Sequence, residues 1–323
     1  NAFYIDEFIR DQCNPLIGEK HTVNDTYLQI TNFIQPTFDK LKEKDDINSF
    51  FLEWISSPIQ PILAIKGTGG VGKTTYAQHL IDLYQSINSE LSTFYIDSLK
   101  IKDELLKRYS DYNQLTIYNF YEALYEQSDK SYDKLNEELF KLNVDIGNIL
   151  IVIDGLDEVI SKLPNFNVKT FLQSIIDISS DLGGAKVIIT CRSHFWNNEV
   201  FQQQHIKELE LNPFNKKQTV NFFRKAFPEE SKINKALRLS DEFKLPEDKD
   251  KDIYQPYVLD VIRSIIETDN DKSFQEIRLH NSQFLNTDIH NEFIIHRDCD
   301  RERNRVGQIS VDKQIKFFQY LAV

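Results

Sequence analysis

The sequence has no methionine, three cysteines and only ten glycines in 323 residues. Cys13, Cys191 and Cys299 lie far apart in no paired spacing, which indicates reduced thiols in a cytoplasmic protein and not a disulfide framework. No apolar run approaches the ~18–20 residues of a membrane span, and no signal peptide is visible. The missing methionine, including at Asn1, predicts that the chain is a fragment of a longer protein.

Basic residues are scarce relative to acidic ones. The chain has 38 Lys and Arg against 50 Asp and Glu, a net charge of −12. This balance argues against a generally nucleic-acid-binding surface, and we expect this chain to bind no nucleic acid directly. The length exceeds that of a usual single domain, so we expect one full domain and one or two smaller modules.

Four of the ten glycines fall between residues 67 and 72, where Gly67 to Thr74 match the phosphate-loop pattern G-x-x-x-x-G-K-[ST]. An apolar run, Ile62 to Ile65, precedes the loop, and a helical pattern follows it. Glycines let backbone N–H groups face an anion, and the helix adds the positive end of its dipole. We therefore predict ATP or ADP with Mg²⁺ as cofactors. The predicted nucleotide-binding residues are Gly67, Thr68, Gly69, Gly70, Val71, Gly72, Lys73, Thr74 and Thr75.

Two residues of this motif have predicted roles of their own. Lys73 places a positive charge on the β- and γ-phosphates, so it counts among the catalytic candidates. The Thr74 hydroxyl is predicted to bind Mg²⁺.

Apolar runs alternate with helical patterns in the first two thirds of the chain, which predicts an α/β fold with a parallel sheet and helices on both faces. Beyond Pro213 the strand signals stop and helical patterns continue. Strands are expected at 62–66, 93–97, 148–154, 186–190 and 206–211. Helices are expected at 46–56, 74–84, 101–142, 168–182, 216–227, 231–243 and 256–266, with a charged loop at 246–252 and further helix in 271–323.

Polar residues at the predicted strand ends supply the remaining chemistry. Asp154 ends the most apolar run and is the second predicted Mg²⁺ ligand. The loop after it carries Asp157 and Glu158, either of which could orient or deprotonate the attacking water; Glu158 is favoured. Arg192 could contact the γ-phosphate and report its presence, or could simply pair with an acid at the surface.

Other chemistries have weaker support. Cys191 has no partner histidine at motif spacing, and His290, His296 and Cys299 match no zinc pattern. A GTPase would need an Asn-Lys-x-Asp motif after the phosphate loop, and none is present. A small-molecule kinase would not need both Asp157 and Glu158.

Three stretches, Lys66 to Thr75, Asp154 to Glu158 and Thr190 to Arg192, together resemble the NACHT clade of STAND P-loop ATPases. The doubled acid after the strand aspartate is that clade's mark. Residues 290–305, with Arg301-Glu302-Arg303, are similar to the helix that opens the next module in prokaryotic members, antiviral-defence ATPases included. The resemblance implies a nucleotide-binding domain at 46–212, a helical lid at 213–270, and the start of a winged-helix-like or helical module at 271–323. Residues 1–45 would be a linker or the remnant of an effector domain.

Within the lid, Pro256 of Tyr254-Gln255-Pro256-Tyr257 would pack against the nucleotide base, although Tyr254 stands where the family usually has glycine. The resemblance also implies a signalling switch that is closed with ADP and assembles with itself when ATP is bound. Its trigger would be a protein, such as a viral one, and its sensor and effector domains would lie outside this fragment. Slow hydrolysis would reset it.

The alternative is an AAA+-type motor that remodels protein or nucleic acid. It is disfavoured because no clear arginine-finger motif follows Arg192, and no aromatic-basic loop of the kind that grips single strands is present.

Overall fold

A computed structural model describes residues 33–38, 47–87, 92–127, 134–196, 203–241, 243–245 and 252–268, together with Lys313. The chain divides into two compact units. The first contains Pro36–Asn212, and the second contains the chain from Pro213 onward together with residues 33–35. The expected terminal modules, 1–45 and 271–323, lie almost entirely outside the described residues. Only residues 33–38 and Lys313 of these modules are described. Most of the loop 246–252 also lies outside the described residues, as do three of the dismissed metal or thiol candidates, His290, His296 and Cys299.

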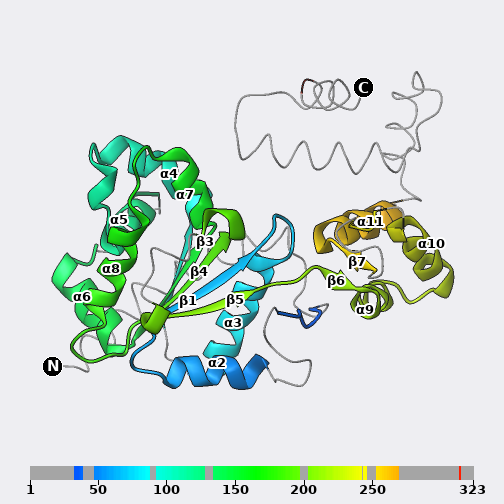
Figure 1. Ribbon diagram of the computed structural model, residues 1–323, viewed down its shortest axis with the longest axis horizontal. Coiled ribbons are helices and arrows are strands. Elements are labelled where there is room, and N and C mark those ends of the chain that lie inside the picture. The colour runs from blue at the N-terminus through cyan, green and yellow to red at the C-terminus, as the bar shows by residue number, and fades with distance from the viewer. Residues whose placement is uncertain are drawn as a thin grey trace. The chain divides into compact units, whose positions relative to one another are not determined.

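The first unit alternates strands and helices (Figure 1). In chain order its elements are α2 (Ile47–Ser56), β1 (Ile62–Gly67), α3 (Lys73–Ile87), β2 (Ser92–Asp97), α4 (Ser98–Arg108), η2 (Tyr112–Gln114), α5 (Ile117–Gln127), α6 (Glu137–Ile146), β3 (Ile149–Asp154), α7 (Leu156–Lys162), α8 (Val168–Ile178), β4 (Lys186–Arg192), η3 (Ser193–Phe195), η5 (Gln203–His205) and β5 (Ile206–Glu210). The five strands appear where the apolar runs predict them.

The five strands form one parallel sheet in the order β2-β3-β4-β1-β5. The central strands are apolar along their length because helices cover both faces, as parallel sheets require. β4 lies between β1, which leads into the phosphate loop, and β3, which ends in Asp154. The predicted fold class, a P-loop α/β sheet with helices on both faces, is confirmed.

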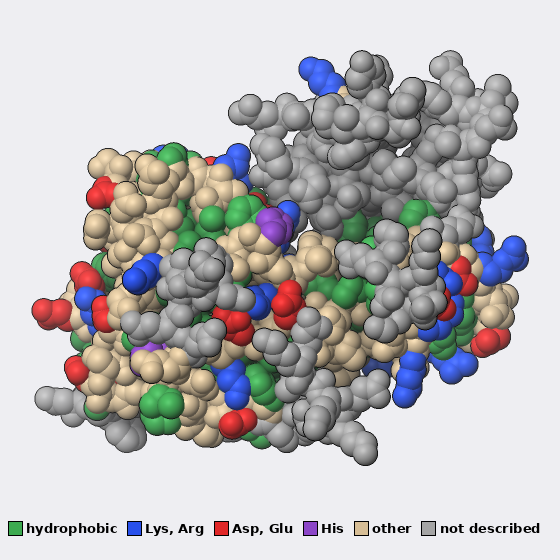
Figure 2. Space-filling view, in the orientation of Figure 1, with side chains coloured by type: hydrophobic (Ala, Val, Ile, Leu, Met, Phe, Trp, Pro, Cys, Tyr) green, Lys and Arg blue, Asp and Glu red, His purple; other side chains and the backbone are tan. Residues whose placement is uncertain are grey.

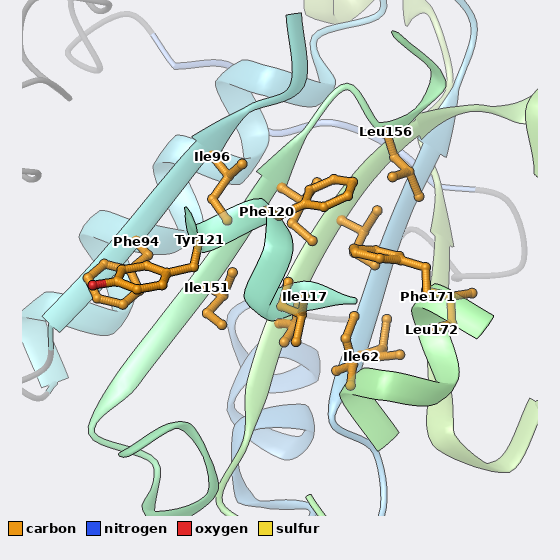
Figure 3. Close-up of a cluster of buried hydrophobic side chains, with 14 of the residues drawn as sticks. Ile62, Phe94, Ile96, Ile117, Phe120, Tyr121, Ile151, Leu156, Phe171 and Leu172 are labelled. Carbon is orange, nitrogen blue, oxygen red and sulfur yellow. The ribbon is translucent and has the colours of Figure 1, made fainter. Parts of the chain in front are cut away.

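Side-chain alternation divides the sheet into two faces. One face packs against α4 to α8 in a large apolar cluster, in which Ile62 and Ile151 of the sheet lie near Phe120 and Phe171 (Figure 3). On the opposite face, α3 contacts β1, β3 and β4, and Tyr84 of α3 meets Phe51 of α2 edge to face. Burial on both faces holds the strand ends, and so the site, in fixed positions.

The helical pattern over 101–142 contains breaks that the sequence analysis did not predict. It is divided among α4, η2, α5 and α6. The Asp111 and Asn136 side chains accept hydrogen bonds from the backbone N–H groups of Asn113 and Leu139, and so begin new helices. Such caps end a helical stretch without any Gly or Pro. Helix α8 also ends at Ile178, four residues earlier than expected.

The second unit consists of α9 (Lys216–Ala226), α10 (Glu230–Asp241) and α11 (Pro256–Thr268), with the two-residue strands β6 (Phe214–Asn215) and β7 (Ile253–Tyr254). The expectation that strands stop at Pro213 is therefore wrong, because β6 and β7 pair antiparallel. Two residues are too few for an alternating pattern to appear in the sequence. The three helices share one apolar core with the buried Tyr254 side chain.

No helix among the residues described above has the length and apolarity needed to cross a membrane. On the face shown in Figure 2, acidic and basic side chains of the first unit are interspersed.

Candidate nucleotide-binding site

The loop between β1 and α3 has a backbone that only glycine adopts easily. Gly67 ends β1 with φ +154°, and an added Cβ there would lie 2.8 Å from Val71 Cγ1 and 3.2 Å from the Leu211 carbonyl oxygen. Gly70 and Gly72 have φ of +75° and +100°. At Gly69 and Gly72, by contrast, an added Cβ would meet nothing within 4 Å. The loop is thus tight at its base and open along its outer side, as a phosphate-binding loop requires.

Lys73 is the first residue of α3, and its ammonium group points back over this loop. Nζ donates hydrogen bonds to the carbonyl oxygens of Gly67, at 3.0 Å, and Thr68, at 2.9 Å. Burial lowers the pKa of Lys73 to about 8, although Asp157 and Asp154 raise it in part. Phosphate oxygens are the charged acceptors that would compensate for this burial.

Thr74 and Asp154 lie together at the start of α3 and the end of β3. The Thr74 hydroxyl donates to Asp154, with Oγ1 2.8 Å from Oδ2 and 3.1 Å from Oδ1. A hydroxyl and a carboxylate beside phosphate-binding amides are the donor set that Mg²⁺ uses in nucleotide sites. These two residues therefore fit the metal, and Thr75 follows them in the first turn of α3.

Asp157 and Glu158 lie in the first turn of helix α7 and not in a loop, which corrects the expectation from the sequence. Gly155 at φ +74° turns the chain, and α7 then begins with two acids at the positive end of its dipole. Both side chains are buried, with 4% and 8% of their surface exposed, so they need partners.

Arg192 pairs with Asp157 and lies close to Glu158. Its Nε lies 3.0 Å from Asp157 Oδ2, and its backbone N–H donates to Asp157 Oδ1 at 3.2 Å. Nη2 lies 3.8 Å from Glu158 Oε1. The structure thus shows Arg192 paired with acids at the sheet edge, and its contact with a γ-phosphate stays a prediction.

Residues 47–192 match the model of the family described as Nephrocystin 3, N-terminal. The match begins at α2 and ends at Arg192, so it contains the phosphate loop, Asp154 and the acidic pair. The match covers less than half of the 323 residues, and it supports the prediction of a P-loop NTPase domain of the NACHT/STAND type. The similarity to prokaryotic defence members stays a prediction.

Solved structures resemble the chain less specifically. A Walker-type ATPase of Pyrococcus abyssi is 16% identical, covers 86% of this chain and 79% of its own, and has a TM-score of 0.48. Domain III of the replication initiation protein DnaA of Thermotoga maritima is 18% identical, with 82% and 92% covered and a TM-score of 0.43. A chain of the HORMA, CdnC and Trip13 complex of Escherichia coli is 11% identical, with 91% and 87% covered and a TM-score of 0.43. A search of curated proteins finds no match.

Pro256, the predicted contact of the nucleotide base, is the first residue of α11 in the second unit. The tyrosine in place of the family's glycine, Tyr254, is buried, and its hydroxyl donates to Asp241 at 2.7 Å. Tyr254 thus has a packing role within the second unit, while the base contact of Pro256 stays a prediction.

Sequence reasoning missed two residues that contact Asp154. The Tyr95 hydroxyl donates to Oδ2 at 2.8 Å, and the Thr190 hydroxyl donates to Oδ1 at 2.5 Å. Period-two alternation along β2 and β4 places both on the sheet face that carries Asp154 and α3. That alternation was visible in the sequence, but the strand order was not.

A second polar network fixes the base of the phosphate loop. Lys66 Nζ donates to Glu208 Oε2 of β5 at 2.9 Å, and Trp196 Nε1 donates to Glu208 Oε1 at 2.9 Å. Ser193, the residue after Arg192, donates to Glu210 Oε1 at 2.6 Å. The segment after Arg192 is thereby bonded to the last strand before Pro213.

Proposed function

We propose that this chain is the ATP-dependent switch of a STAND signalling protein, in which Arg192 exchanges its acidic partners for the γ-phosphate. The observation that carries the proposal is the Arg192–Asp157 ion pair, placed at the end of the strand beside β1. Arg192 is the register partner of Gly67, the first residue of the phosphate loop. The guanidinium therefore lies one strand away from the loop that would hold the phosphates.

Differential affinity is what makes such an arrangement a switch, because a ligand shifts an equilibrium only by binding one state better. ADP leaves the Asp157–Arg192 pair without a competing anion. ATP adds a γ-phosphate, which competes with two carboxylates for the guanidinium. About a quarter of the Arg192 side chain is exposed, 24%, so it can change partners without leaving a packed core.

In this proposal, Asp157 and Glu158 also support the ATP hydrolysis that returns the switch to its ADP-bound state. Both oxygens of Asp157 bind Arg192, through its backbone N–H and its Nε, so Asp157 is a positioning residue in this state. Glu158 Oε1 lies farther away, 3.8 Å from Nη2, so Glu158 interacts more weakly with Arg192 than Asp157 does. Glu158 is therefore the better general base for an attacking water, and hydrolysis is slow while Arg192 stays near the acids.

Trigger-dependent self-assembly and a role in antiviral or innate defence are part of this proposal. Their support is the resemblance of the phosphate-loop, acidic and Arg192 motifs to that clade, together with the NACHT-type match of residues 47–192. The trigger would be a protein sensed outside this fragment.

The test compares ADP and a non-hydrolysable ATP analogue for wild type and Arg192→Ala by titration calorimetry. A charge-assisted contact contributes roughly 1.5–3 kcal/mol, so ATP-analogue affinity should fall about ten- to a hundredfold while ADP affinity barely changes. Arg108→Ala is the matched control, because Arg108 also pairs with an acid of the same unit, Glu126 at 2.9 Å, at the far end of α4.

Equal losses of ADP and ATP-analogue affinity would mean that Arg192 has a structural role only. The proposed switch would then have no residue that detects the γ-phosphate. In the full-length protein, light scattering should show that Arg192→Ala no longer assembles with ATP and trigger. Continuous turnover without any trigger-dependent assembly would instead favour the motor.

A further inference from the structure

Asp154, the predicted Mg²⁺ ligand, accepts hydrogen bonds from three hydroxyl groups on three different elements. Thr74 comes from α3, Tyr95 from β2 and Thr190 from β4. Tyr95 binds Oδ2, and Thr190 binds Oδ1. If the Thr74 hydroxyl turns toward a metal, each carboxylate oxygen therefore still keeps one donor.

The Thr190 hydroxyl is not free to rotate away from Asp154. The backbone N–H of Gly155 donates to Thr190 Oγ1 at 2.8 Å, so the single hydroxyl proton of Thr190 must point to Asp154. The Gln78 side chain is a second polar neighbour of the Tyr95 phenol. Gln78 is buried and lies one helical turn after Thr74 on α3, so it shares the face of Thr74.

We propose that Tyr95 and Thr190 are positioning residues that hold Asp154 in a metal-binding orientation, and that they set the Mg²⁺ affinity of the nucleotide complex. Hydrogen bonds to a ligating carboxylate fix its plane and direct its remaining lone pairs toward the metal. Without them, the carboxylate would have to be ordered each time the metal binds. The inference rests on the proposed nucleotide site.

A merely structural role makes a different prediction. Thr190 is buried and Tyr95 is half-buried, so loss of packing would weaken nucleotide binding with and without Mg²⁺. Loss of positioning would weaken only the nucleotide binding that depends on Mg²⁺. The two roles therefore separate when nucleotide binding is measured in EDTA and across a Mg²⁺ titration.

The experiment titrates MgCl₂ into the full chain with a fluorescent ADP analogue and measures the half-saturating Mg²⁺ concentration. Tyr95→Phe and Thr190→Val should each raise it about tenfold, with analogue affinity in EDTA unchanged. Thr190→Ser keeps the hydroxyl and should restore the wild-type value. Circular dichroism establishes that each variant is folded.

Two variants remove the same groups elsewhere in the first unit. Tyr109→Phe also deletes a phenol that donates to a carboxylate, that of Glu122 at 2.6 Å. Thr93→Val deletes a buried hydroxyl that has no hydrogen-bond partner in the described structure, on the strand that carries Tyr95. Both variants should leave the half-saturating Mg²⁺ concentration within about twofold of wild type. Neither Tyr109 nor Thr93 donates a hydrogen bond to the Asp154 carboxylate, so neither can orient it.

Each outcome bears on a different claim. An unchanged Mg²⁺ midpoint in Tyr95→Phe and Thr190→Val, with wild type binding the analogue normally, would overturn the positioning role alone. Equal loss of analogue binding in EDTA would assign both residues to packing and overturn it too. Wild type that binds no analogue at all would remove the nucleotide site, and the inference with it.

Discussion

Arg192 and Gly67 are register partners at the ends of β4 and β1, so the guanidinium of the acidic cluster emerges beside the first residue of the phosphate loop. The strands are parallel and end at one edge. Ligands of open parallel sheets bind at that edge, where the strand order reverses. Loop, metal ligands and Arg192 consequently form one site, although 125 positions separate Gly67 from Arg192 in the sequence (192 minus 67).

The acidic pair should divide into a structural and a chemical residue. Glu158→Gln should leave nucleotide affinity unchanged and lower hydrolysis about 10²- to 10⁴-fold, the usual contribution of a positioned general base. Asp157→Asn should lower the melting temperature, because it leaves the Arg192 charge with a weaker partner. Phosphate release and thermal melting of both variants provide the comparison. If Asp157→Asn instead keeps its stability and traps ATP, the roles are reversed.

Nucleotide affinity should fall as pH rises above 8. In the ligand-free site the pKa of Lys73 is lowered to about 8, mainly by burial. Phosphates favour the charged form and raise this pKa, so binding takes up a proton above pH 8 and is strongest below it. ADP affinity measured between about pH 6.5 and 9.5 should therefore decline up to tenfold per unit. Lys73→Ala should bind at least about tenfold more weakly at pH 7 and lose this dependence; a parallel decline in both proteins would exclude Lys73 as its source.

Two glycines of the loop should respond differently to alanine. Gly67→Ala places a Cβ 2.8 Å from Val71 Cγ1 at φ +154°, so it should cost about 1–3 kcal/mol of folding free energy. Gly69→Ala meets nothing within 4 Å and should melt like wild type. Its added methyl group would nevertheless narrow the open side of the loop and weaken nucleotide binding. Equal melting temperatures for the two variants would contradict the tight loop base.

Lys186 should stabilise the fold by binding the C-terminal end of helix α2. It is buried with 4% exposed, and Nζ donates to the carbonyl oxygens of Trp54, at 3.1 Å, and of Ser57. Lys186→Met removes the ammonium donor to these carbonyl groups, of which Trp54 keeps one hydrogen bond from the Ser57 N–H. The loss should cost about 1–3 kcal/mol in urea unfolding. Lys207→Met, which removes a surface ion pair to Glu53 of the same helix, is the control and should cost about 0–1 kcal/mol.

The pH dependence of the same variant gives a second readout. Burial lowers the pKa of Lys186 to about 8 from its ordinary 10.5, so the unfolded chain binds more protons between these values. Wild-type stability should therefore rise between about pH 8 and 10, and Lys186→Met should show less of this rise. An identical pH profile for the two proteins would mean that Lys186 does not titrate in this window.

The sequence by itself determined the elements that depend on local pattern. Gly67 to Thr74 specify the loop, because its backbone conformations and its charges must be consecutive. The run ending in Asp154 specifies a buried strand, because a strand covered on both faces is apolar throughout. The sequence did not predict the short strands β6 and β7 or the breaks between α4 and α6. Two-residue strands and side-chain caps leave no periodic signal in a sequence.

Only the tertiary structure decided which strand ends meet. The placement of β4 between β1 and β3 brings Thr190 to Asp154 and Arg192 to Gly67, and the pairing of β2 with β3 brings Tyr95 to Asp154. Alternation along a strand fixes which face a side chain occupies, but not which strand lies next to it. That choice depends on packing between segments far apart in the chain, so the partners of Asp154 and Arg192 could be identified only in the folded sheet.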